Sequence, residues 1–255
     1  MIVRVHPDAA ALGTAAADDA AAAMCEAVAA RGVANVMFAS GNSQLAFLDA
    51  LVVRDDVDWS CIVGFHMDEY CGIPGDHPAS FRRYMRERII ERVHPWEFHE
   101  VLGDAPDTAA ECDRYAALLR DHPLDLCCLG IGENGHLAFN DPPVADFDDP
   151  LDVKIVELDD ACRQQQVGEG HFPSVGVVPT TAITVTIPAL LRSGTVLAIV
   201  PEARKREPVQ RAVEGPISTE CPASVLRTRT NVTLHLDADS AAGLDPGHRA
   251  GSDQR

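Results

Sequence analysis

Two adjacent carboxylates, Asp68 and Glu69, lie just beyond an apolar run of strand length at residues 61–65. A carboxylate at the end of a buried strand is destabilising unless it is solvated or used in chemistry. Partial burial and a neighbouring negative charge raise the pKa of such a group, which suits a general base. The pair therefore predicts a base at the end of this strand, and a surface turn or helix cap is the alternative interpretation.

A histidine and a carboxylate follow the apolar run at residues 124–129. The intervening stretch is glycine-rich, which permits close backbone approach, and His136 precedes Asp141, which could orient the imidazole. Residues 130–135 match the pattern G-x-G-x-x-G. This match lies far from the first expected strand and lacks the acidic residue expected on the next strand end, so we predict no dinucleotide cofactor.

A short polar turn, Ser40-Gly41-Asn42-Ser43, separates the apolar run at residues 36–39 from an expected helix. Such a turn exposes backbone N–H groups beside the positive end of a helix, which favours phosphate binding. The alternative is that these residues only form the turn and cap the helix. Lys205, one of two lysines in the chain, follows another apolar run and could reach the same phosphate.

A metal site at His66, Asp68, Glu69 and His136 is chemically conceivable, because imidazole and carboxylate suit several divalent ions. The two histidines are not at the spacing of paired ligands, so we predict no metal. The eight cysteines form no CxxC pair, which argues against a zinc site or a disulfide framework.

Apolar runs of strand length alternate with segments of helical pattern. The expected strands are residues 2–5, 36–39, 61–65, 124–129, 195–200 and 232–236. The expected helices are residues 9–30, 43–53, 80–93, 108–120, 186–192 and 203–213. This alternation predicts an α/β fold, a Rossmann-like, mainly parallel sheet with helices on both faces. Ligands bind beyond the carboxyl ends of such strands, where the polar residues above all lie.

Two stretches break the alternation, residues 141–160 and residues 163–178, and we expect an irregular lid or binding segment there. Residues 1–237 are expected to form a single domain and residues 238–255 a flexible C-terminal tail.

The chain has 255 residues and a net charge of −18. A surface this negative repels phosphate backbones and anionic headgroups, so we expect neither nucleic-acid nor membrane partners. No signal-like or membrane-spanning run is visible, which indicates a cytoplasmic protein. The sequence leaves a homo-oligomer open.

Together these segments resemble the glucosamine-6-phosphate deaminase (isomerase) family, which shares its fold with the 6-phosphogluconolactonases. The resemblance covers about residues 2–237 and is carried by MDEYCG from residue 67, HPASF from residue 77, GHLAFNDP from residue 135 and VEG from residue 213. The lactonases lack the Phe-Asn-acid-Pro continuation after Gly-His, so the deaminase branch is favoured.

The resemblance implies conversion of an amino-sugar 6-phosphate to the ketose 6-phosphate with release of ammonia, without metal or organic cofactor. Asp68, next to Glu69, would move a proton between C2 and C1 through an enolamine. His136, assisted by Asp141, would open the sugar ring. The turn at residues 40–43 and Lys205 would hold the phosphate.

The chain departs from the family pattern at three places. Asn134 stands where the family has Asp, and Asp141 stands where it has Glu, so an acid–His–acid relay shrinks to a pair unless Glu133 points inward. The surroundings of the family's phosphate-binding arginine do not match, and Arg163 is a candidate for that role. The basic residues of an allosteric pocket are not evident around residues 152–154, so we do not predict that regulation.

The leading hypothesis is therefore a glucosamine-6-phosphate deaminase, an isomerase and hydrolase of amino-sugar metabolism. A galactosamine-6-phosphate deaminase and a 6-phosphogluconolactonase are the enzymatic alternatives. A non-catalytic sugar-phosphate sensor is a third class, suggested by the loss of the acid at Asn134. Measuring whether ammonia or acid is released distinguishes the two deaminases from the lactonase.

Overall fold

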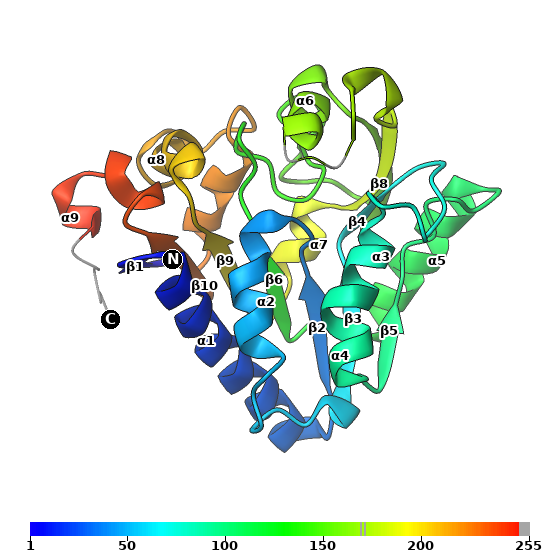
Figure 1. Ribbon diagram of the computed structural model, residues 1–255, viewed down its shortest axis with the longest axis horizontal. Coiled ribbons are helices and arrows are strands. Elements are labelled where there is room, and N and C mark those ends of the chain that lie inside the picture. Colours follow the sequence, from blue (N-terminus) through cyan, green and yellow to red (C-terminus); the bar gives the residue numbers. More distant parts are fainter. Residues whose placement is uncertain (169, 171, 250–255) are drawn as a thin grey trace.

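The computed structural model describes residues 1–168, 170 and 172–249 (Figure 1). Within them lies a seven-stranded sheet in which every neighbouring pair of strands runs parallel, in the order β1-β10-β9-β6-β2-β3-β5. Its strands are β1 (Ile2–His6), β2 (Ala34–Phe38), β3 (Ile62–His66), β5 (Glu97–His99), β6 (Leu126–Leu129), β9 (Thr195–Val200) and β10 (Val232–Asp237). The mainly parallel α/β fold expected from the sequence is confirmed.

Helices cover both faces of this sheet (Figure 1). One face packs against α1 (Ala9–Arg31), α2 (Leu45–Leu51) and the helical segment formed by α3 (Phe81–Met85), a π turn (Arg86–Ile90) and α4 (Glu91–Val93). The other face packs against α5 (Thr108–Asp121), α7 (Ile187–Leu191) and α8 (Arg206–Glu214). Successive strand residues alternate between the two layers.

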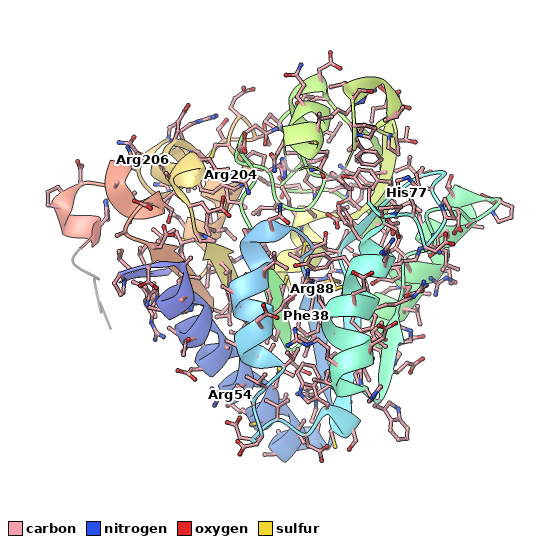
Figure 2. The ribbon with its side chains drawn as sticks, in the orientation of Figure 1. Phe38, Arg54, His77, Arg88, Arg204 and Arg206 are labelled. Atoms are coloured by element: carbon pink, nitrogen blue, oxygen red, sulfur yellow. The ribbon has the colours of Figure 1, made fainter. Side chains whose placement is uncertain are left out.

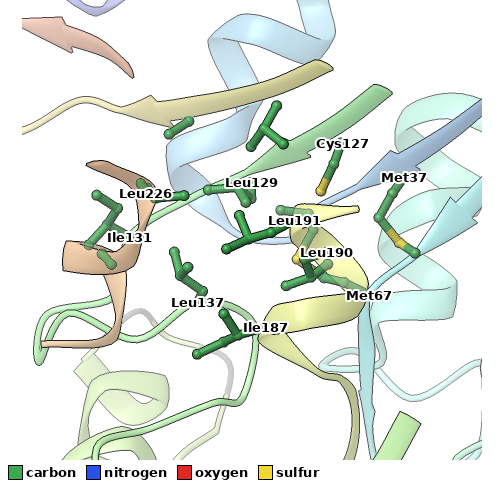
Figure 3. Close-up of a cluster of buried hydrophobic side chains, with 14 of the residues drawn as sticks. Met37, Met67, Cys127, Leu129, Ile131, Leu137, Ile187, Leu190, Leu191 and Leu226 are labelled. Atoms are coloured by element: carbon green, nitrogen blue, oxygen red, sulfur yellow. The ribbon is translucent and has the colours of Figure 1, made fainter. Parts of the chain in front are cut away.

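The alternation is visible in β2 and β6. Phe38 and Cys128 point to the face covered by α1 and α2, whereas Met37 and Cys127 point to the opposite core, which Figure 3 shows together with Leu190 of α7. The adjacent cysteines are thus packing residues on opposite faces of one strand. Both sheet faces are buried, as a parallel sheet requires.

The first helix has clear sequence signals at both ends. The Asp8 carboxylate accepts a hydrogen bond of 2.8 Å from the N–H of Ala11, and Gly32 ends the helix at a φ of 80°, which a glycine adopts without strain. Its buried face consists largely of alanines, which allow α1 to lie close to the sheet and to α2.

A second, smaller sheet lies at the carboxyl end of the main sheet (Figure 1). Its antiparallel order is β4-β8-β7, with β4 (Asp68–Tyr70), β8 (Thr181–Val185) and β7 (Val153–Glu157), and α6 (Asp160–Gly168) follows β7 in the chain. The expectation of an irregular segment at residues 141–160 and 163–178 is therefore wrong where β7 and α6 form. The other described residues of these two stretches form turns and one short 3-10 helix, Val175–Val177.

The chain beyond Asp237 also differs from the expected flexible tail. Ser240–Gly243 forms a 3-10 turn, in which the N–H of Ser240 donates to the Asp237 carboxylate at 2.8 Å, and Pro246–Arg249 forms the short helix α9. Ala241 and Leu244 are buried in the core. Those two apolar side chains hold the segment against the domain, and residues 250–255 of the expected tail lie outside the described residues.

Among the described residues, no helix is both long and apolar enough to cross a membrane.

Candidate active site

A pocket opens where the order of the main sheet reverses, between β2 and β6. From this point the chain continues outward to β3 and β5 on one side and to β9 and β10 on the other. The lining comes from the turn at residues 39–43, from Met67 and Asp68, from the loop at residues 130–139, and from Gln165, Gln166 and Lys205. The space between these residues measures about 610 Å³, a figure that includes solvent at the open mouth of the pocket.

Asp68 lies at the junction of the two sheets. The chain leaves β3 after His66 and enters β4 at Asp68, whose backbone pairs with Thr184 of β8. The side chain is buried, and its Oδ1 has no hydrogen-bond partner among the described residues.

Burial raises the pKa of Asp68 well above its usual value, and the neighbouring charge of Glu69 raises it further. A hydrogen bond from Ser40 acts in the opposite direction, and Asp141 adds a smaller increase. A carboxylate with this environment readily accepts a proton.

Glu69, predicted beside Asp68 as part of the catalytic pair, does not line the pocket. Its carboxylate accepts hydrogen bonds from the Ser80 hydroxyl at 2.6 Å and from the N–H groups of Phe81 and Arg82 at 3.2 and 3.0 Å. Burial raises the pKa of Glu69, and these donors oppose the rise. The geometry thus gives Glu69 the role of fixing the start of α3, because consecutive strand residues point to opposite sides.

His136, Asp141 and Asn134 form a hydrogen-bonded group behind the pocket wall. His136 Nδ1 lies 2.8 Å from Asp141 Oδ1, and the Asn134 side-chain amide donates to the same oxygen at 2.7 Å. The side-chain Oδ1 of Asn134 accepts a hydrogen bond of 3.0 Å from the backbone N–H of His136. A Cβ on Gly132 would lie 2.2 Å from the imidazole, so only glycine at that position leaves room for the ring.

Asp141 has the opposite electrostatic environment to Asp68. Burial alone would raise its pKa, but the charge and the hydrogen bond of His136, together with the Asn134 amide, outweigh burial and lower it. Of the three residues, His136 lines the pocket, and the other two support it from behind.

The predicted phosphate turn lines the same pocket. Gly41 has a φ of 117°, which favours glycine there, and its carbonyl accepts a hydrogen bond of 2.9 Å from the Tyr84 hydroxyl. Gln44 ties the turn to β9 through a bond of 3.2 Å to the Ile199 carbonyl. Ser40, Gly41, Asn42 and Ser43 all line the pocket, as does the buried Lys205.

Arg163 does not reach the pocket, so the structure gives no support for it as a phosphate ligand. Its guanidinium donates to the carbonyl of Val175 at 2.7 Å and forms a longer ion pair with Asp160. Glu133 does not replace the missing acid either, since it forms an ion pair of 3.3 Å with Arg204. Arg204 is labelled in Figure 2.

His66 lies outside the pocket lining. It is fully buried, and its Nε2 accepts a hydrogen bond of 2.8 Å from the N–H of Val101. Burial lowers the pKa of His66 to about 3, so the imidazole is neutral and structural.

Two polar residues of the pocket lining were not predicted from the sequence, Gln165 and Gln166 of α6. The side-chain Oε1 of Gln166 accepts a hydrogen bond of 2.6 Å from the Tyr70 hydroxyl, and the side-chain Oε1 of Gln165 accepts one of 3.2 Å from the backbone N–H of Glu133. These bonds attach α6 to the small sheet and to the glycine-rich loop. A run of glutamines carries no periodic signal, so only the fold could place them.

The comparisons with known proteins agree on one family. The family described as glucosamine-6-phosphate isomerases/6-phosphogluconolactonase matches residues 7–150. A protein named glucosamine-6-phosphate deaminase from Exiguobacterium sibiricum is 35% identical over 201 residues, 78% of this chain and 77% of that protein. A Streptococcus pneumoniae protein of the same name is 33% identical over 218 residues, 85% of this chain and 89% of that one.

Solved structures show the same likeness. A structure of a monomeric glucosamine-6-phosphate deaminase superposes with a TM-score of 0.87 at 29% identity, covering 96% of this chain and all 100% of that one. A 6-phosphogluconolactonase from Shewanella baltica superposes with a TM-score of 0.76 at 20% identity, covering 93% and 97%. The second likeness concerns the fold alone.

Proposed function

The chain belongs to the family of glucosamine-6-phosphate isomerases and 6-phosphogluconolactonases, and from that premise we propose that it converts glucosamine 6-phosphate to fructose 6-phosphate and ammonia. It is an enzyme, a deaminating aldose–ketose isomerase. The observation that carries the proposed mechanism is the presence of two differently tuned carboxylates at one pocket, Asp68 and Asp141.

Asp68 serves as the base of the isomerisation. After ring opening, its carboxylate takes a proton from C2 of the substrate, exchanges it with solvent, and delivers a proton to C1. The amino group at C2 passes a proton to O1, so the reaction goes through an enolamine and leaves an imine at C2. Water then adds to the imine, and ammonia leaves. The raised pKa of Asp68 supports this role, because the group must both accept and release a proton near neutral pH.

His136 serves in ring opening, which moves a proton between O1 and the ring oxygen. Asp141 is held 2.8 Å from His136 Nδ1, so it orients the ring and stabilises the imidazolium. The lowered pKa of Asp141 keeps that carboxylate charged through the cycle. Asn134 fixes the same oxygen with its amide, and therefore acts by positioning rather than by proton transfer.

The phosphate is bound at the turn of residues 40–43 with Lys205. Backbone N–H groups and an ammonium complement a dianion, and both line the pocket that contains Asp68 and His136. This end fixes the sugar so that its C1 and C2 atoms reach the base.

The experiment that tests the function is an ammonia assay on the purified protein with glucosamine 6-phosphate and galactosamine 6-phosphate. Hydrolysis of 6-phosphogluconolactone is measured in parallel as acid release. We expect ammonia from the glucosamine ester. Ammonia from the galactosamine ester alone would show that galactosamine 6-phosphate is the substrate. Lactone hydrolysis without ammonia would contradict the proposal. Binding of all three without turnover would favour a sensor.

Partners and location follow as parts of the same proposal. A solved glucosamine-6-phosphate deaminase described as monomeric superposes on this chain with a TM-score of 0.87, so we expect a single copy of this chain to be active, with a turnover per chain that does not change with protein concentration. We further propose a cytoplasmic enzyme without nucleic-acid partners, since its substrate is a phosphorylated metabolite and its net charge is −18. Cell fractionation and a DNA retention assay check these points.

A further inference from the structure

Cys162 lies beside the His136–Asp141 pair but has no part in the reaction proposed above. One ligand-type atom from each of the three side chains lies within 4.8 Å of the other two: a thiol sulfur, a carboxylate oxygen and a ring nitrogen. Cys162 and Asp141 are each 1% exposed, whereas His136 is partly open to the pocket. The sulfur comes from α6 and the other two atoms come from the loop after β6, so the fold brings them together across two segments.

The Asp141 carboxylate contacts both of the other groups. Its Oδ1 is occupied by the Asn134 amide and by His136 Nδ1. Its Oδ2 is buried, and the Cys162 thiol is a hydrogen-bond donor to this carboxylate. The three groups are therefore already in mutual contact, and a bound ion would replace the thiol proton.

We propose that His136, Asp141 and Cys162 form a binding site for Zn²⁺, and that the bound ion inhibits the enzyme. The mixed nitrogen, oxygen and sulfur donors match zinc, whereas Mg²⁺ and Ca²⁺ prefer oxygen ligands alone. Zinc bonds of about 2.0–2.3 Å in tetrahedral geometry separate two ligand atoms by roughly 3.3–3.8 Å. Small side-chain rotations therefore bring the three atoms into range. Three protein ligands leave the fourth tetrahedral position for a water molecule.

Binding exchanges protons but transfers no electrons. Burial and the charges of Asp141 and Asp159 raise the pKa of Cys162, so the metal-free thiol is protonated and must release its proton to water when the Zn–S bond forms. Neutral His136 gives its Nδ1 lone pair to the ion, and Asp141 gives a carboxylate oxygen. An occupied site removes both side chains from ring opening, which is the part of the inference that rests on the proposed function.

The first test detects metal binding at the site and does not depend on enzyme activity. Co²⁺ is added to the apo protein, and a thiolate-to-cobalt charge-transfer band is measured in the near ultraviolet. We expect the band in the wild-type protein and in Cys112→Ser, whose thiol is also buried but lies outside the cluster. Cys162→Ser and Cys162→Ala should lose it, with folding checked by circular dichroism. A band that persists in both Cys162 variants, or is absent from the wild type, would overturn the site.

The second test measures inhibition of the enzyme by Zn²⁺. Ammonia release from glucosamine 6-phosphate is measured against Zn²⁺ concentration, with EDTA as the reversal control. We expect the inhibition constant to rise at least about tenfold in Cys162→Ser, while metal-free turnover stays within about twofold of wild type. Equal inhibition of both proteins would refute an inhibitory role. A wild-type protein that releases no ammonia but shows the Co²⁺ band would refute the proposed function and leave the metal site standing.

Discussion

Two regions of the site each contain a buried carboxylate, and they shift its pKa in opposite directions. At the junction of the two sheets, Asp68 has a raised pKa and an oxygen that no described residue contacts by a hydrogen bond. In the loop after β6, Asp141 is held by His136 and Asn134 and has a lowered pKa. Both side chains are almost fully buried, so burial alone does not set the charge state. The partners decide which carboxylate accepts protons and which one keeps its charge.

The largest effect should come from Asp68→Asn, which removes the group with the raised pKa and keeps its shape. We expect kcat to fall about 10³-fold or more and KM to change little, because only the proton-transfer step loses its base. Steady-state ammonia release checks this. Asp55→Asn, at an exposed carboxylate, is the control and should behave as wild type. Wild-type turnover in Asp68→Asn would remove Asp68 from the mechanism.

Asp141→Asn addresses the other region and should have a smaller effect. An amide still contacts His136 but no longer stabilises the imidazolium, so ring opening slows and kcat falls roughly 100-fold. Because hexose phosphates also open without an enzyme, substrate supplied in the open form recovers part of the rate. An equal loss with the open form would show that Asp141 acts in a later step.

Lys205→Ala leaves both carboxylates in place and tests the phosphate end alone. A charge-assisted contact to the phosphate exists in the ground state and the transition state alike, so KM should rise about tenfold while kcat stays within a few-fold. Kinetics on glucosamine 6-phosphate measure the split. An unchanged KM would place the phosphate elsewhere.

Asn134→Asp converts the donor on Asp141 Oδ1 into a second acid. The two carboxyls then share a proton at low pH and repel each other once it is lost, so the pKa of Asp141 should rise. We expect kcat/KM to fall about threefold near neutral pH, with the deficit decreasing as the pH is lowered. The pH profile of the variant against wild type gives the answer, and a deficit independent of pH would contradict the shared-proton explanation.

The Asp→Asn substitutions at the two carboxylates should change the free energy of unfolding in opposite directions. The folded pKa of Asp68 is raised, so its charge lowers stability once the pH exceeds the ordinary value, and Asp68→Asn should gain about 1 kcal/mol near neutral pH. The folded pKa of Asp141 is lowered, so its contribution is present above the ordinary value and is lost as the pH falls through the folded pKa. Asp141→Asn should therefore lose about 1 kcal/mol. Urea unfolding at neutral pH measures both, and shifts of the same sign would contradict the comparison.

The same two regions show which parts of the site could be predicted from the sequence. Asp68, His136, Lys205 and the turn at residues 40–43 were predicted because each follows a strand with a clear apolar pattern, and parallel strands end at one edge. The small sheet was missed: β4 has only three residues, and β7 shows one face to solvent, with Ile155 exposed. Short strands of mixed polarity depend on their neighbours rather than on their own pattern.

Side-chain direction was the other limit of prediction from sequence. Glu69 was assigned to the site as the neighbour of Asp68, and Arg163 as a candidate for the family's phosphate-binding arginine. Glu69 instead binds the backbone at the start of α3, and Arg163 binds the Val175 carbonyl. Those partners lie twelve or more residues away in the chain, so no local pattern shows them. Gln165 enters the pocket only because α6 docks there.

The central claim, that Asp68 moves the proton while the His136–Asp141 pair opens the ring, is tested most directly by isotope incorporation. Glucosamine 6-phosphate is converted in D₂O, and deuterium at C1 of the product is followed by NMR together with the rate of anomer exchange. We predict that the wild type incorporates deuterium at C1 and that Asp68→Asn loses this incorporation but still accelerates anomer exchange. Deuterium incorporation at the wild-type rate in Asp68→Asn would contradict the account.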